Sequence, residues 1–98
     1  MQLAELQRLV NDFVNEMGWY GEGSDHKQTA RSLAISLSLE AAEVLEHFQW
    51  HEEPRDRSEV AGELADVMHY LLQLAEVLDI DLEKAVLAKL EYNRTRKW

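Results

Sequence analysis

The chain has 98 residues, a formal net charge of −9, a hydrophobic share of 46% and no cysteine. Such an acidic chain is poorly suited to bind nucleic acid or an anionic membrane surface. Without cysteine, it forms no disulfide and offers no thiolate to a metal ion. Its length suits a single domain over residues 1–98. No apolar run reaches the roughly 18–20 residues of a membrane span and no signal peptide is evident, so we expect a cytoplasmic protein.

The first predicted element is an amphipathic helix over about residues 2–17. Leucine, valine and phenylalanine recur there at three- and four-residue steps, which is typical of one buried helical face. Gly18 is its expected C-terminal stop. The glycine-rich stretch that follows is a predicted loop, and it displays Trp19 and Tyr20.

The second helix is expected to begin near Ser24 or Asp25, either of which can cap it, and to end near Trp50. A turn containing Pro54 leads to a third helix that ends near Leu78. The expected buried stripe of the second helix comprises Ala30, Leu33, Leu37, Ala41, Val44 and Phe48, and that of the third comprises Val60, Leu64, Val67, Leu71, Ala75 and Leu78.

Asp81 is the expected N-cap of a last helix that starts at Leu82. No segment shows the alternation of a β-strand. Four helices joined by short turns predict an all-α, four-helix bundle. A chain this short buries a modest core by itself, so we expect oligomerisation to complete the bundle.

Two pairs of carboxylates accompany the buried stripes: Glu40 with Glu43 in the second helix, and Glu63 with Asp66 in the third. Residues three apart are neighbours on a helix surface. Because these acids flank the stripes, two packed antiparallel helices would bring all four carboxylates to one place. Such a place repels itself unless cations occupy it. Oxygen ligands favour Mg²⁺, with Mn²⁺ as a possible substitute.

Other interpretations of the acids are weaker. Any one of them is most simply a solvated surface charge, but like charges at this spacing destabilise a helix, so stability alone would not select all four. A di-iron site would need Glu-x-x-His on two helices. Asp66 with His69 only approximates that motif, and the second helix lacks it because His47 follows Glu43 by four residues.

Four blocks of this sequence resemble motifs of the all-α nucleoside triphosphate pyrophosphohydrolases and occur in the same order. That family includes the MazG-like enzymes and their dCTP pyrophosphatase and dUTPase relatives. Both acid pairs match the family signature Glu-x-x-Glu followed by Glu-x-x-Asp. Gln28–Leu33 is similar to the segment before the first pair in MazG, and Glu46–Trp50 to the segment after it in the dCTP pyrophosphatase branch. Lys89–Arg96 resembles the C-terminal Lys-x-x-x-Asn-x-x-Arg motif. The resemblance covers residues 19–97.

The resemblance implies a MazG-like bundle that splits a nucleoside triphosphate into monophosphate and pyrophosphate, with house-cleaning of canonical or modified dNTPs as its role. It implies a catalytic, Mg²⁺-binding set: Glu40, Glu43, Glu63 and Asp66. Lys89 and Arg96 would grip phosphates, and Asn93 the sugar or a phosphate oxygen. The side chains expected to contact the base are first Trp50 and Tyr70, then Trp19, His47 and His26.

The resemblance also implies a homodimer or homotetramer with sites near subunit boundaries, in which the first helix is a natural interface element. Base and sugar preference stay open, because the segment from Trp19 to His26 is longer and richer in glycine than in the dCTP branch. Two other functions also stay open. One is a nucleotide- and metal-binding regulatory bundle that does not hydrolyse, and the other is a structural helical oligomer whose acids only face water.

Overall fold

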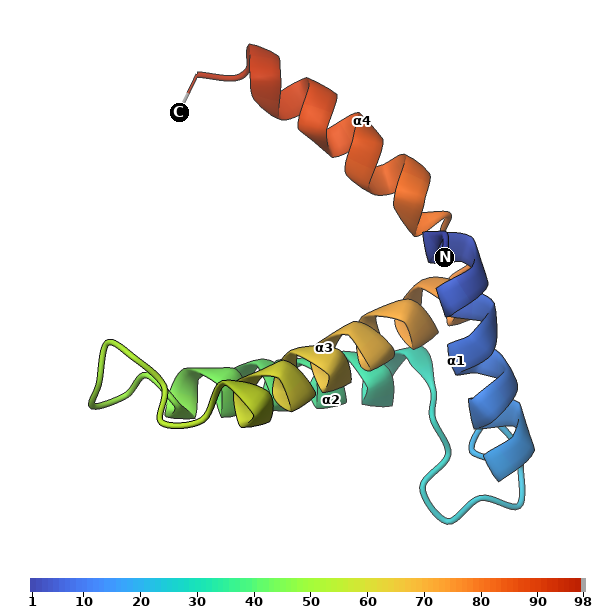
Figure 1. Cartoon of the computed structure of the whole chain (residues 1–98). Helices are drawn as coiled ribbons and strands as arrows, with labels where there is room; N and C mark the ends of the chain where they lie inside the picture. Colours follow the sequence, from blue (N-terminus) through green and yellow to red (C-terminus); the bar gives the residue numbers. More distant parts are fainter. Residues whose placement is uncertain (98) are drawn as a thin grey trace.

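The computed structural model describes residues 1–97, which form four α-helices and no strand (Figure 1). They are α1 (Leu3–Met17), α2 (Ala30–Glu46), α3 (Arg57–Val77) and α4 (Leu82–Thr95). The all-α, four-helix prediction is therefore confirmed. Trp98, the last residue of the predicted domain, lies outside the described residues. Within residues 1–97, no helix is both long and apolar enough to cross a bilayer.

Helices α2 and α3 lie side by side and antiparallel, and α1 packs across the C-terminal end of α3 (Figure 1). The fully buried apolar side chains come from all three helices: Val14 of α1, Leu33 of α2, and Leu72 and Ala75 of α3. The core therefore sits where α1 meets the α2–α3 pair. Burial of one such leucine stabilises the fold by about 1.5–3 kcal/mol.

Helix α2 begins later than the sequence predicted, at Ala30 instead of Ser24 or Asp25. Thr29 and Ser32 form a capping box: the Ser32 N–H donates to Thr29 Oγ1 at 3.3 Å, and the Thr29 N–H donates to Ser32 Oγ at 2.8 Å. These reciprocal bonds satisfy backbone donors that a helix start leaves unpaired. The helix also ends early, at Glu46 instead of Trp50, so residues 18–29 and 47–56 are both connecting segments.

The ends predicted at Gly18 and Asp81 are confirmed, and the structure adds Asp56 as the N-cap of α3. Gly18 ends α1 in the left-handed region at φ 73°, where glycine has no steric penalty, and the Trp19 N–H donates to the Val14 carbonyl at 3.2 Å. Asp56 Oδ1 caps α3 by accepting the Ser58 N–H at 2.9 Å. Asp81 Oδ1 caps α4 by accepting the Lys84 N–H at 3.1 Å.

Parts of the predicted buried stripes are exposed. Ala41 and Phe48 of the α2 stripe and Leu64 and Leu78 of the α3 stripe all face solvent in the single chain. The physical reason is that α4 does not fold back over α2 and α3 but projects from the end of α3 with sparse contacts to the other helices (Figure 1). Val86, Leu87 and Leu90 of α4 are exposed as well. Completion of the bundle by oligomerisation stays a prediction.

Loss of the capping box should destabilise the fold. Thr29→Ala removes the side-chain acceptor for the Ser32 N–H, so we expect the free energy of unfolding in urea to fall by about 1 kcal/mol. Ser38→Ala on the same helix is the matched control, because the Ser38 hydroxyl only donates to the Ala34 carbonyl within a formed turn. Equal midpoints for the two variants would contradict the assigned start of α2.

Candidate functional site

The four predicted acids lie on the two helices that pack side by side, Glu40 and Glu43 on α2 and Glu63 and Asp66 on α3. Burial raises the pKa of Glu40, and a hydrogen bond with Glu43 together with the negative charges of Glu43, Asp66 and Glu63 raises it further. A carboxylate responds in this way only to charges that lie close to it. The charges of the other three acids therefore reach Glu40, two of them across the contact between α2 and α3.

The inner members of this acid cluster are partly dehydrated. Glu40 and Glu63 are half-buried, whereas Glu43 and Asp66 are exposed. Glu40 Oε2 has almost no accessible surface and no hydrogen-bond partner among the described residues. An unpaired, buried carboxylate oxygen costs folding free energy that a hard cation would relieve. The donor set of the cluster thus fits an oxygen-seeking divalent ion.

The arrangement fits a hydrated ion better than a cage made only of protein. Among residues 1–97, no three histidine, aspartate or glutamate side chains already surround one point as direct ligands. Mg²⁺ commonly keeps several waters and takes one or two carboxylates together with substrate phosphates. The acid cluster has the composition for that mode of binding.

His47, which was predicted to contact the base, contacts an acid instead in the single chain. It forms the C-cap of α2, and its Nε2 lies 2.5 Å from Glu63 Oε2. The two atoms are in close contact without the alignment of a hydrogen bond, and they form an ion pair whenever the imidazole is protonated. This pair ties the end of α2 to α3 beside the acid cluster, and a role of His47 at the base stays a prediction.

The predicted aromatic contacts separate into two groups. Towards the C-terminal end of α2, Trp50 is 81% exposed and lines a hollow of about 240 Å³ with His47 and Arg55. On the other side of the cluster, the Tyr70 ring stacks on His69 with centroids 5.7 Å apart. Each group includes a histidine next to one acid of the cluster, His47 beside Glu63 and His69 beside Asp66, whereas His26 is exposed in the loop outside both groups.

Trp19 joins the second group through residues that were not predicted as site residues. Its ring packs edge-on against Phe13 at 5.4 Å, and Phe13 packs against His69 at 6.0 Å. His69 follows Asp66 by one helical turn. Burial lowers the pKa of His69, and the negative charge of Asp66 raises it by a smaller amount. The sequence could have pointed to His69 through its three-residue spacing from Asp66. Phe13 could be predicted only as part of the apolar face of α1.

Helix α4 carries the predicted phosphate-binding residues away from the acids. The Lys89 ammonium lies 4.8 Å and the Arg96 guanidinium 5.9 Å from the centre of the Tyr92 ring, so both cations flank one aromatic side chain. Asn93 is half-buried, with an unpartnered Oδ1. Because α4 projects from the α2–α3 pair (Figure 1), one chain does not bring these residues beside the acid cluster. Their role stays a prediction.

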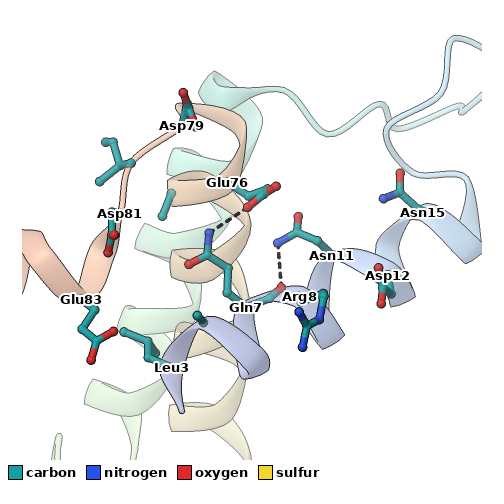
Figure 2. A pocket seen from close by; sticks show the side chains of 13 residues that line it. Leu3, Gln7, Arg8, Asn11, Asp12, Asn15, Glu76, Asp79, Asp81 and Glu83 are labelled. Atoms are coloured by element: carbon teal, nitrogen blue, oxygen red, sulfur yellow. Dashed lines mark hydrogen bonds between the residues drawn. The ribbon is translucent and has the colours of Figure 1, made fainter.

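A larger hollow of about 530 Å³ lies elsewhere, between α1 and the turn from α3 to α4 (Figure 2). None of the four predicted acids lines it. Its charged lining consists of Arg8 against Asp12, Glu76, Asp79, Asp81 and Glu83. Because none of the predicted site residues lines it, the hollow is not the candidate active site.

Comparison with known proteins agrees with this geometry. The model of the MazG-like family matches residues 35–97, a segment that contains both acid pairs and the Lys89–Arg96 motif. The chain belongs to the MazG-like family. The predicted family and fold are thus confirmed.

Similar proteins include dCTP pyrophosphatase 1 of Homo sapiens, at 34% identity, and that of Bos taurus, at 33% identity. Each match covers 96% of this chain and 58% of the relative, so the MazG-like chain spans little more than half of those proteins. The crystal structure of a pyrophosphatase from Archaeoglobus fulgidus is similar with a TM-score of 0.78 and 34% identity, over 97% of this chain and 93% of that one.

The acid cluster should make stability depend on pH. Because the pKa of Glu40 is raised in the folded state, its contribution to stability is complete at pH values below the ordinary carboxyl pKa and is lost as pH rises through the raised value. Glu40→Gln should therefore raise the melting temperature of the metal-free protein at neutral pH and flatten its decline between acidic and neutral pH.

The measurement is thermal unfolding in a chelating, low-salt buffer at a series of pH values. Glu46→Gln is the matched control, because Glu46 is an exposed acid of α2 outside the cluster. Identical pH profiles for Glu40→Gln and the unchanged protein would contradict the convergence of the four acids.

Proposed function

We propose that this chain is an Mg²⁺-dependent nucleoside triphosphate pyrophosphohydrolase that converts a (d)NTP and water into the (d)NMP and pyrophosphate. The observation that carries the proposal is the placement of both acid pairs on the packed helices α2 and α3, where Glu43, Glu63 and Asp66 help to raise the pKa of Glu40. The family model spans all four residues, which match the signature that the sequence resemblance implies, and the similar proteins are named pyrophosphatases. We propose house-cleaning of canonical or modified dNTPs as the role, carried out by one domain over residues 1–98.

The proposed chemistry assigns different tasks to inner and outer acids. Half-buried Glu40 and Glu63 anchor the cation site, where Mg²⁺, when bound, would neutralise phosphate charge and favour formation of a nucleophilic hydroxide. Exposed Glu43 and Asp66 are open to solvent, so either carboxylate can orient the attacking water and accept its proton. The water oxygen bonds to the α-phosphorus as the bond to the α–β bridging oxygen breaks, and pyrophosphate leaves.

The position of the acids between two aromatic groups supports a base on either side of them. Trp50 and His47 flank one end of the acid cluster, and Tyr70 and Trp19 lie towards the other. A triphosphate whose α-phosphate sits at the cluster has a stacking surface in both directions. We propose that one of these groups holds the base of the substrate.

We further propose that the protein acts as a homodimer or homotetramer. Helix α4 exposes Val86, Leu87 and Leu90 and carries Lys89 and Arg96 away from the acids of its own chain. A second copy would cover these apolar side chains and would bring its Lys89 and Arg96 to the acids. The positive charge is needed because the four carboxylates and a triphosphate are all negative. The complete site then contains α2 and α3 of one subunit and α4 of the other.

Turnover should depend on the acid cluster and on the cation. Incubated with a panel of NTPs and dNTPs and Mg²⁺, the protein should release monophosphate and pyrophosphate, and excess chelator should stop the reaction. Glu43→Gln should lower kcat/KM by about 100-fold or more, because several kcal/mol of charge stabilisation depend on this site. Glu16→Gln, at an exposed acid of α1 that lines neither hollow, should leave it unchanged.

Separation of the products by anion-exchange chromatography is the measurement. Diphosphate and phosphate as products, or tight nucleotide binding without turnover by the metal-loaded protein, would contradict the proposed reaction. The second outcome would favour the non-hydrolysing regulatory bundle.

Subunit mixing tests the shared site. Glu43→Gln and Lys89→Ala are each expected to be defective alone. When the two are unfolded and refolded together, half of random dimers are mixed, and each mixed dimer has one intact site of two if α4 serves the other subunit. Activity at low substrate concentration should then return to about a quarter of the unmutated level. If α4 serves its own subunit, every site keeps one defect and mixing restores nothing.

A further inference from the structure

The segment between α1 and α2 is a closed loop. The Gln28 N–H donates to the Trp19 carbonyl at 2.9 Å, which joins the two ends of a stretch with no helix or strand. Compact loops whose ends meet in this way frequently have a function. This one, named here the 18–29 loop, carries Trp19 at its start and Gln28 near its end.

A single buried amide from α3 holds both ends of the loop. Gln73 is fully buried, and its Nε2 donates to Gln28 Oε1 and lies 3.5 Å from the Tyr20 hydroxyl. A buried amide without partners would destabilise the fold, and a leucine of similar size at this position would have no such cost. The amide nitrogen of Gln73 is therefore explained by what it binds, and both of its partners belong to the 18–29 loop, while Gln73 Oε1 has no partner among the described residues.

The hydrogen bonds continue from the loop into α1. The Tyr20 hydroxyl donates to Asn11 Oδ1 at 2.7 Å, and burial raises the pKa of this phenol, which keeps its proton. Asn11 is itself buried, and its Nδ2 donates to the Gln7 carbonyl at 2.9 Å. Figure 2 shows this bond and the outermost one, from Gln7 Nε2 to Glu76 Oε2 at 2.8 Å. The loop is thus fixed between two helices.

The fixed loop places Trp19 at one end of a row of rings that reaches the acid cluster. Trp19 packs against Phe13, and Phe13 against His69. His69 stacks on Tyr70 and lies close enough to Asp66 to be affected by its charge. Any movement of the loop moves Trp19, the outermost ring of this row, which is named here the Trp19 wall.

We propose that Gln73 is a positioning residue for substrate specificity: by binding Gln28 and Tyr20 it fixes the 18–29 loop and the Trp19 wall against which the base is selected. This inference rests on the proposed function. Gln73 touches neither the phosphates nor the acids, so its loss relaxes discrimination between bases and weakens substrate binding while the phosphate chemistry continues.

Gln73→Leu tests the proposal, because it keeps the volume and removes both bonds. Selectivity, measured as the ratio of kcat/KM for the best dNTP to that for the next base, should fall about tenfold, the order of one hydrogen bond. KM for the best dNTP should rise, and kcat should stay within about threefold. Hydrogen exchange of the amides in the 18–29 loop should accelerate, while that of α2 and α3 stays unchanged.

Tyr20→Phe provides a second variant without a change in the core, and it should produce the same effects to a smaller extent. Gln7→Leu is the matched control: it removes the outermost bond, to Glu76, and should change neither selectivity nor loop exchange. Unchanged selectivity and loop exchange in both Gln73→Leu and Tyr20→Phe would overturn the inference. If the unmutated protein hydrolyses no nucleotide, the proposed function fails, and unchanged loop exchange in Gln73→Leu would separately overturn the fixed loop.

Discussion

Repulsion between carboxylates on α2 and α3 is the constraint on which the rest of the structure depends. The two helices are held together by buried side chains such as Leu33 and Leu72, so the acids beside them cannot move apart without loss of the core. Glu40 bears most of this conflict, because it is half-buried and the charges of three other acids act on it. A fold that accepts this cost without a cation would be difficult to explain. In the proposed function, a cation would offset the charge of both the acids and a triphosphate, and the same arrangement would then serve as a binding site.

The acids and the residues that complete a site are separated in the single chain. Two antiparallel helices bring together the acids, but the helix that carries Lys89 and Arg96 points away from them (Figure 1). The exposed apolar side chains of α4 and the exposed acids of α2 and α3 are thus consistent with one explanation, which is that a second copy supplies what the first lacks. The 18–29 loop is different, because buried hydrogen bonds within the same chain already hold it in place.

Local patterns were sufficient for much of the fold and for the acid cluster. The ends at Gly18 and Asp81 follow from backbone chemistry that a short segment determines, and acids three residues apart must share a helix face. The start of α2 was not predictable from Ser24 or Asp25 alone. Ser24, Asp25 and Thr29 are all residue types that can cap a helix, but only Thr29 forms reciprocal bonds, with Ser32. The pairing of His47 with Glu63 and the burial of Gln73 depend on contacts between helices, which no local pattern contains. The direction of α4 was missed for the same reason.

The most direct measurement is a crystal structure of the protein with Mn²⁺ and a dNTP analogue that has a non-hydrolysable α–β bridge, with diffraction data collected at the manganese edge. The account predicts anomalous density between Glu40, Glu43, Glu63 and Asp66, with the α-phosphate of the analogue beside it. Nucleotide bound at another place, with no anomalous density between these four carboxylates, would contradict the central claim.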